Sequence, residues 1–387
     1  MRRLCLWAMC GLLAGGCAVI GDIREESKVN VEKHDKAMRT EEAPPEEFAW
    51  HRPSEAPFRL AGFAWFRQDG AYRRMPLEPQ WPITEAVDKL ANCTSGGQVQ
   101  FRTDSRKLAV RVELAAAATM DHMPQTGAAS FDCYIGPPGH QRYVKTSRFG
   151  WGGTSYTCPL FEFPEREMRN VTLNFPLYQG VKEVHVGLEP GAKIMAPPAY
   201  EDDRPIIVYG TSITQGGCAE RPGIAYTNIL SRKLNRPFIN LGFSGSGRGE
   251  PEMARIIATI PNPGCFVLDY EANAAGKQLE NTLDEFVTIL REAHPEVPIL
   301  VVSRIPWARD LISSTQMADR VHKRDFQRDL VEGRRVAGDE NIRFLDGETL
   351  LPDDPNECTV DGVHATALGF WQMARAMEPV LRGLLGP

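Results

Sequence analysis

Two segments far apart in the sequence carry side chains suited to nucleophilic catalysis. Ser212 stands in the segment 209–217, directly after a short apolar run, and His364 ends the D-G-V-H segment that starts at Asp361. A serine hydroxyl is a poor nucleophile until a base removes its proton, and a histidine can do this near neutral pH. A carboxylate three residues away, Asp361, could hold the imidazole in the correct tautomer.

Each segment alone also has a simpler interpretation. Serine is common in turns that lead from a strand into a helix, where it caps the helix. Asp361 could likewise only cap a final helix that begins near Thr366. Ser212 has no G-x-S-x-G pattern around it, which disfavours a standard α/β-hydrolase. Ser212 and His364 can form a catalytic pair only if the fold brings both segments to one edge of a sheet.

Two further segments could supply donors to a negatively charged oxygen. Acyl transfer creates such an oxygen, which two or three fixed donors stabilise. The glycine-rich segment 240–247 could turn the backbone N–H of Gly245 inward, and it lacks the G-x-x-x-x-G-K-[ST] pattern of a phosphate loop. Asn273 could donate its side-chain amide, although asparagine is also a common turn residue.

Apolar patterns predict the elements that must position these residues. Continuous apolar runs, typical of strands buried on both faces, stand at 206–209, 238–241, 265–268, 299–302 and 342–345. One face of an intervening helix is formed by Leu279, Leu283, Phe286 and Leu290. Strands that alternate with helices predict a three-layer, flavodoxin-like α/β domain over 199–387. Such sheets place their sites beyond the carboxyl ends of the strands.

The preceding part of the chain has a period of two. Residues 98–102 and 108–114 alternate apolar with polar side chains, and clusters of glycine and proline separate such runs. We therefore expect a β-sandwich or jelly-roll domain over 57–198.

As a set, these features resemble the four blocks of the SGNH/GDSL hydrolases, a family of serine esterases. Ser212, Gly245, Asn273 and His364 occur in the order and strand context of those blocks. The resemblance implies that Ser212 is the nucleophile, and that its own N–H, the Gly245 N–H and the Asn273 side chain form the oxyanion hole. His364 would be the base, supported by Asp361. The first block reads G-T-S where G-D-S is commonest, and the third reads D-Y-E-A-N where G-x-N-D is common.

The resemblance extends into the β-rich part. Residues 130–134, S-F-D-C-Y, resemble the G-x-D-L-Y signature of a domain that precedes a subgroup of these esterases, with Ser130 in place of Gly and Cys133 in place of Leu. The likeness then covers the chain from about residue 58 to its end.

Weaker candidates border these segments. Gly242, Arg248 and Glu250 could line a substrate pocket, and a surface pair of Arg248 and Glu250 is the alternative. His122 could line a cleft shared by the two domains, or lie exposed in a loop.

The N-terminus is typical of an exported protein. Residues 1–3 are basic, residues 4–13 are almost wholly apolar, and A-G-G-C ends at Cys17, which resembles the bacterial lipobox with Ala14 where that pattern prefers Leu. We expect a signal peptide over 1–17, lipidation of Cys17, a polar linker over 18–56, and a periplasmic or cell-surface location.

Composition narrows the partners. A net charge of −6 over 387 residues argues against a nucleic-acid-binding face. The six cysteines after Cys17 have no C-x-x-C spacing, so no zinc site is predicted. No other cofactor is expected. Export would permit disulfides, but the sequence does not pair the cysteines.

These features predict a serine esterase that removes small acyl groups, first of all acetyl, from carbohydrate. One alternative is a non-catalytic, glycan-binding surface lipoprotein, against which the Ser212 and His364 pair argues. Another is a lipase or thioesterase, for which no segment shows an apolar acyl cleft. The sequence leaves the oligomeric state open.

Overall fold

The computed structural model describes residues 31–386. They belong to two units, residues 1–41 and 42–387. The described part of the first unit holds two short helices, α2 (Val31–His34) and η1 (Lys36–Met38). The predicted signal peptide and Cys17 lie outside the described residues. Among the described helices, none combines the length and apolar character needed to cross a membrane.

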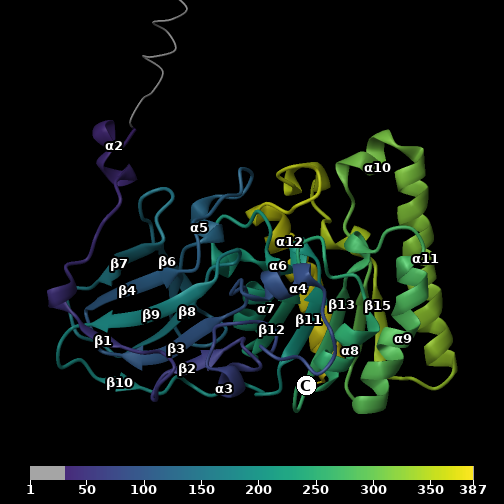
Figure 1. The fold of residues 1–387 in the computed structure, drawn as a ribbon, viewed down its shortest axis with the longest axis horizontal. Coiled ribbons are helices and arrows are strands. Elements are labelled where there is room, and N and C mark those ends of the chain that lie inside the picture. Colours follow the sequence, from purple (N-terminus) through teal and green to yellow (C-terminus); the bar gives the residue numbers. More distant parts are fainter. Residues whose placement is uncertain (1–30, 387) are drawn as a thin grey trace, which may run out of the picture. The chain divides into compact units, whose positions relative to one another are not determined.

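The second unit begins with two antiparallel sheets (Figure 1). The first has the order β1 (Ala49–His51), β9 (Val181–Leu188), β4 (Lys107–Leu114) and β7 (Ser155–Glu162). The second has the order β10 (Ile194–Met195), β3 (Gln98–Thr103), β8 (Arg169–Asn174), β5 (Asp132–Ile135) and β6 (Arg142–Thr146), with β2 (Arg59–Ala61) paired to β3. Connections carry η2 (Pro45–Glu47), α3 (Phe66–Asp69), α4 (Glu85–Ala91) and α5 (Gln125–Ala128).

Alternating residues of the sandwich strands form its core. On β4, Leu108, Val110 and Val112 are buried and share one apolar cluster with Phe101 of β3 and Leu173 of β8. This packing of two sheets through alternate side chains confirms the predicted β-sandwich class.

The sandwich begins earlier than the linker predicted over 18–56 allows. Ala49 of β1 pairs with Leu188 of β9, and the buried side chains of Ala43 and Phe48 pack with Ala109. The final part of the expected linker is therefore folded. β1 spans only three half-buried residues, which is too short to give a recognisable alternation in the sequence.

Five parallel strands form the third sheet, in the order β12 (Phe238–Gly242), β11 (Ile206–Gly210), β13 (Cys265–Asp269), β14 (Ile299–Val302) and β15 (Ile342–Leu345). Each strand coincides with a predicted apolar run, and the order is that of flavodoxin-like sheets. The helices are α6 (Ser212–Gln215), α7 (Tyr226–Leu234), α8 (Pro251–Ala258), α9 (Gln278–Ala293), α10 (Ala308–Ile312), α11 (Ser314–Val336) and α12 (Ala367–Leu385). Single turns of 3₁₀ helix are η3 (Pro222–Ile224), η4 (Glu271–Asn273), η5 (Gly347–Leu350) and η6 (Pro355–Cys358).

Helices cover both faces of this sheet. Ile206 and Val208 of β11 pack in one cluster with residues of α7 and α12. Ile207 and Tyr209 point to the other face and pack in a second cluster with residues of α8 and α9. The predicted three-layer α/β class is thus confirmed, and the four apolar residues predicted on one helix face are all buried on α9.

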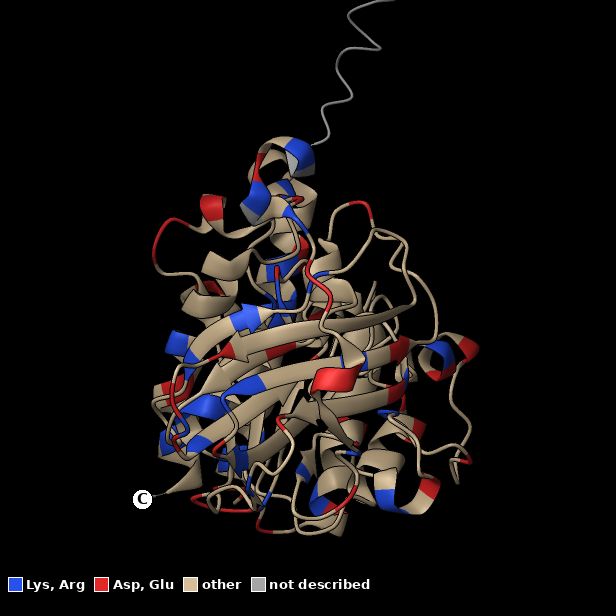
Figure 2. Ribbon diagram, turned by 90° about the vertical axis from the view of Figure 1, so that its left-hand side faces the viewer, with Lys and Arg blue, Asp and Glu red and all other residues tan. Residues whose placement is uncertain are grey.

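Charged residues of both signs are interspersed over the face of the molecule seen in Figure 2. This distribution follows from the mixed order of acidic and basic residues along the chain.

Candidate active site

Ser212 lies at the carboxyl end of the first parallel strand. β11 ends at Gly210, Thr211 caps the short helix α6, and Ser212 is the first residue of that helix. The Thr211 hydroxyl accepts a hydrogen bond from Ile213 N, and Thr211 N donates to the hydroxyl of Thr214. Thr211 thus orders the turn that presents Ser212, whose exposed fraction is 8%.

A chain of hydrogen bonds joins Ser212 to two residues near the C-terminus. Ser212 Oγ lies 2.9 Å from His364 Nε2, and His364 Nδ1 lies 2.7 Å from Asp361 Oδ2. Through this arrangement a hydroxyl can pass its proton to an imidazole while a carboxylate stabilises the resulting imidazolium.

Asp361 is held in place by backbone groups. Its Oδ1 accepts hydrogen bonds from His364 N at 2.8 Å and from Val363 N at 3.0 Å. Partial burial opposes ionisation, but the hydrogen bonds from His364 and Val363 outweigh it and lower the pKa of Asp361. The final helix is capped by Thr366, which accepts from Gly369 N, so Asp361 is not its cap.

The two predicted donor segments contact one another. Asn273, at the end of η4, donates from Nδ2 to the carbonyl oxygen of Phe243 at 3.2 Å. Gly245, two residues further along that segment, has a φ of +66°, which favours glycine. Arg248 Nε donates to the Gly245 carbonyl oxygen at 2.9 Å. An asparagine amide has two N–H donors, so one of them is left for a ligand.

Gly242 is predicted to line a substrate pocket, but in the structure it supports the packing of two elements. It is buried at the end of β12, and a Cβ there would come within 2.2 Å of Gln215 N. The missing side chain allows α6 to pack against β12. Among the described residues, Arg248 and Glu250 do not form the surface pair that was the alternative to their lining a pocket: the Arg248 side chain donates to the Gly245 carbonyl oxygen, and Glu250 accepts from the Tyr209 hydroxyl.

His122 lies beside His364. Its side chain is partly exposed, as expected of a loop histidine, yet the centroid of its ring is 5.7 Å from that of His364. His122 belongs to the loop between β4 and α5, so the β-rich part of the chain contributes to the site.

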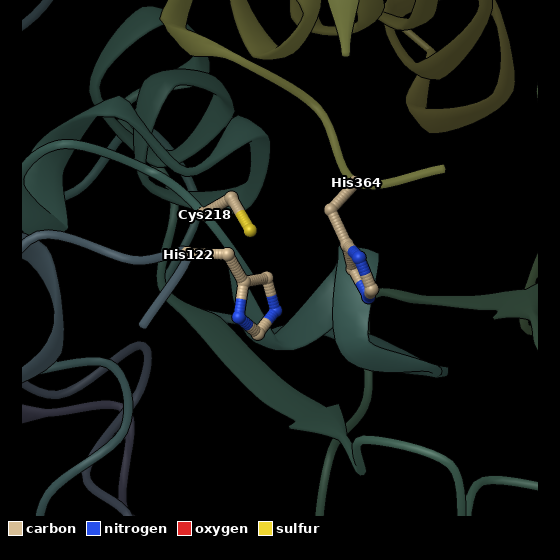
Figure 3. Close-up of side chains that lie close together, drawn as sticks. All are labelled: His122, Cys218 and His364. Atoms are coloured by element: carbon tan, nitrogen blue, oxygen red, sulfur yellow. The ribbon is translucent and has the colours of Figure 1, made fainter. Parts of the chain in front are cut away.

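Two residues at the site were not predicted from the sequence. The Tyr178 hydroxyl, from the β8–β9 connection, donates to the carbonyl oxygen of Ser212 at 3.3 Å. Cys218 follows α6 and is buried, and Figure 3 shows its side chain converging with those of His122 and His364. One ligand atom from each of these three residues lies within 4.8 Å of the others, so they form a candidate metal-binding group. In the sequence, the only signal that points to Cys218 is the pair of glycines directly before it.

The G-x-D-L-Y-like segment connects the two parts of the second unit. Asp132 is fully buried, and its Oδ2 accepts from Gly223 N at 2.7 Å and lies 3.4 Å from Arg221 Nη1. The Arg232 guanidinium stacks 3.9 Å from the ring centroid of Tyr134. These contacts hold the residues that connect α6 to α7. That connection directly follows the turn that carries Ser212.

A second buried carboxyl, that of Asp269, stabilises the position of α6. Asp269 ends β13, and its Oδ2 accepts hydrogen bonds from the hydroxyls of Thr214 at 2.9 Å and Tyr226 at 2.8 Å. Burial raises the pKa of Asp269 to about 7, against the lowering effect of these two donors.

Comparison with known proteins finds a matching protein family for each of the two parts of the chain. Residues 203–382 match the GDSL-like lipase/acylhydrolase family, and residues 48–194 match the GxDLY domain, the N-terminus of SGNH hydrolase-type esterases. No curated protein matches the chain.

Solved structures are similar over most of the chain. A protein from Bacteroides ovatus ATCC 8483, described as a GDSL-like lipase, is 27% identical with a TM-score of 0.78, over 87% of this chain and 98% of that one. The salicylyl-acyltransferase SsfX3 from a tetracycline biosynthetic pathway is 22% identical, with a TM-score of 0.69 over 88% and 99%. A family two carbohydrate esterase from Clostridium thermocellum is 17% identical, with a TM-score of 0.53 over 76% and 93%, and like SsfX3 shares the fold. The chain therefore belongs to the SGNH/GDSL family of carboxylic ester hydrolases, in the subgroup whose hydrolase domain follows a GxDLY domain.

Proposed function

We propose that the protein is a serine esterase that removes small acyl groups, first of all acetyl, from carbohydrate. Ser212 is the nucleophile, His364 the base, and Asp361 orients His364. The observation that carries this proposal is the continuous chain of hydrogen bonds from Ser212 Oγ through His364 to Asp361.

The first step forms an acyl-enzyme. His364 Nε2 takes the proton of Ser212 while Oγ attacks the carbonyl carbon of the ester. The negative oxygen that results accepts hydrogen bonds from the N–H groups of Ser212 and Gly245 and from the Asn273 amide. The C–O bond to the sugar then breaks, and His364 returns its proton to the leaving alcohol.

The second step releases the acid. Water gives a proton to His364 and attacks the acyl carbonyl carbon. The bond to Ser212 Oγ breaks, and Oγ recovers its proton from His364. The products are a free alcohol on the sugar and a carboxylic acid.

A carbohydrate substrate is supported by the surroundings of the site and by the fold. Trp151 is exposed in a loop whose Gly152 N donates to the side chain of Gln125, three residues from His122. An exposed aromatic ring can stack on a sugar ring. The fold is also shared with family two carbohydrate esterases.

Acetate release from a panel of acetylated polysaccharides tests the proposal, with Ser212→Ala as the matched control. We expect the wild-type protein to release acetate and the variant to lose at least about 10³-fold in rate. A fluorophosphonate probe should label the wild type and not the variant. Equal activity of both proteins would contradict the role of Ser212. Failure to label the wild type would favour the glycan-binding alternative.

A series of nitrophenyl esters separates the esterase from a lipase or thioesterase. We expect the acetyl ester to give the highest kcat/KM and longer chains to react more slowly. A maximum at long acyl chains would overturn the proposed substrate class while leaving ester hydrolysis in place.

We also propose that the protein is exported and lipidated on Cys17, as the residue pattern of its first 17 positions suggests. Metabolic labelling with a fatty acid in a bacterial host should label the full chain and not its Cys17→Ala variant. Labelling of both proteins, or of neither, would contradict lipidation at this residue.

A further inference from the structure

Three side chains that could bind a metal converge beside Ser212. His122 comes from the loop after β4, Cys218 from the turn after α6, and His364 from the segment before α12 (Figure 3). One ligand atom from each lies within 4.8 Å of the other two. Two imidazoles and a thiol are donors that Zn²⁺ prefers, whereas Mg²⁺ and Ca²⁺ require oxygen ligands.

Both histidines are oriented as metal ligands usually are. His122 Nδ1 lies 2.9 Å from Asp121 Oδ1, and His364 Nδ1 lies 2.7 Å from Asp361 Oδ2. A carboxylate that binds Nδ1–H fixes the tautomer in which Nε2 carries the lone pair, and such carboxylate–histidine pairs are typical around zinc. The Nε2 of His122 has no hydrogen-bond partner among residues 31–386, so this lone pair is available.

The backbone of Cys218 is held in a conformation that only glycine adopts without cost. Its φ is +70°, in the left-handed region, and the side chain is buried as a free thiol. A non-glycine residue in this conformation is strained, and such strain clusters at functional sites.

The spacing suits a tetrahedral zinc ion after small movements. Bond lengths of about 2.0–2.1 Å to nitrogen and about 2.3 Å to sulfur set the ligand atoms about 3.3–3.7 Å apart.

We propose that His122, Cys218 and His364 bind Zn²⁺, and that the bound ion inhibits the esterase. The Cys218 thiol releases one proton as its sulfur binds the metal. His364 Nε2 gives its lone pair to zinc and can no longer accept the proton of Ser212, so no acyl-enzyme forms. The inhibition rests on the proposed function, whereas the binding of zinc does not.

Titration of the full chain with Co²⁺, followed by displacement with Zn²⁺, tests the binding. We expect one ion per chain and a near-ultraviolet absorption band from thiolate-to-cobalt charge transfer, which zinc abolishes. Cys218→Ala should lose the band, and both Cys218→Ala and His122→Ala should weaken zinc binding by at least about tenfold. Cys265→Ala, which removes a buried thiol of β13, and His140→Ala, which removes an exposed histidine, are matched controls that should keep both properties. Melting temperatures identify any variant that fails to fold.

Absence of the band in the wild type, or equal zinc affinity of the wild type and Cys218→Ala, would overturn the site. Inhibition is measured as the ratio of nitrophenyl acetate hydrolysis with and without Zn²⁺, and EDTA should reverse it. Zinc that binds through Cys218 but leaves this ratio unchanged would overturn the inhibition alone. Zinc that binds through Cys218 to a protein without esterase activity would support the site and contradict the proposed function.

Discussion

At the scale of single residues, the site depends on how its charges are held. Asp361 accepts hydrogen bonds from the backbone N–H groups of Val363 and His364, in addition to its hydrogen bond with the His364 ring. Its pKa is lowered because these bonds outweigh the effect of partial burial, so the carboxylate is ionised throughout the neutral range. The charge that would stabilise a protonated His364 is thus present before the reaction starts.

Asp361→Asn tests this role. The amide keeps the shape but lacks the charge, and it can leave His364 in the wrong tautomer. We expect kcat for nitrophenyl acetate to fall by about 10²–10⁴-fold with little change in KM. A loss below tenfold in a variant with the wild-type melting temperature would show that Asp361 does not orient the base.

Asp269 gives stability an unusual dependence on pH. Its pKa is about 7 in the folded chain and has an ordinary value of 3.8, so the unfolded carboxyl ionises first as pH rises. Between these values the folded state binds more protons, and the free energy of unfolding falls with rising pH. Above about pH 7 both states are ionised and this contribution levels off.

Asp269→Asn removes the titration and keeps an acceptor for Thr214 and Tyr226. Urea unfolding at pH 5 and pH 8 should show that the wild type loses about 2–3 kcal/mol more than the variant over this interval. Identical pH dependence in both proteins would contradict the raised pKa.

At the scale of elements, close packing around α6 sets the geometry of the site. A Cβ on Gly217 would lie 2.8 Å from the Tyr178 hydroxyl, 3.1 Å from the Ser212 carbonyl oxygen and 3.2 Å from His364 Cδ2. A side chain on residue 217 would therefore force Tyr178, His364 or the turn itself to shift.

Gly217→Ala should displace His364 from Ser212 and lower kcat by at least about tenfold, because misplacement on the scale of 1 Å is costly in catalysis. Gly333→Ala is the matched control, since a Cβ on that residue of α11 meets nothing within 4 Å. The control should keep full activity and gain about 0.5–1 kcal/mol in stability. Full activity in Gly217→Ala would show that the turn adjusts freely.

The contact of β5 with the α6–α7 segment is a second element-scale feature. Asp132→Ala leaves Gly223 N without its acceptor and removes the carboxylate that pairs with Arg221, and we expect a loss of about 2–4 kcal/mol in urea unfolding together with lower activity. Asp329→Ala, which breaks an exposed ion pair with Arg328 on α11, should cost less than about 1 kcal/mol. Equal losses in the two variants would contradict a structural role for Asp132.

At the scale of the whole molecule, the β-rich and α/β parts of residues 42–387 share one apolar core. The same cluster contains Val110 and Phe175 of the sandwich and Ile229 and Phe370 of the α/β part. Arg74, buried in the β-rich part, donates to the carbonyl oxygen of Cys93 at 2.7 Å and to that of Gly242 at the end of β12. The site therefore rests on both parts.

Residues 199–387 expressed alone test this dependence. Without Tyr178 and Arg74, and with core side chains exposed to water, we expect less than about 1% of the activity of the full chain and a strong tendency to aggregate. A soluble fragment with full activity in the nitrophenyl acetate assay would contradict the shared core.

The sequence by itself determined the strands of the parallel sheet, their order along the chain and the segments that carry Ser212, Gly245, Asn273 and His364. These follow from apolar periodicity and local motifs, because burial on one or both faces of an element leaves a pattern in consecutive residues. The short strand β1 could not be predicted in this way, since three half-buried residues carry no period.

Only the tertiary structure decided which distant residues meet. The presence of Tyr178 and Cys218 at the site could not be predicted, and for His122 the sequence left a shared cleft and an exposed loop as alternatives. These residues come from separate loops whose relative positions depend on how the sandwich packs on the sheet. The absence of a C-x-x-C motif in the sequence likewise concerns only ligands that are close along the chain. A metal-binding group assembled from three loops leaves no local spacing, since tertiary packing alone sets the distances between its ligand atoms.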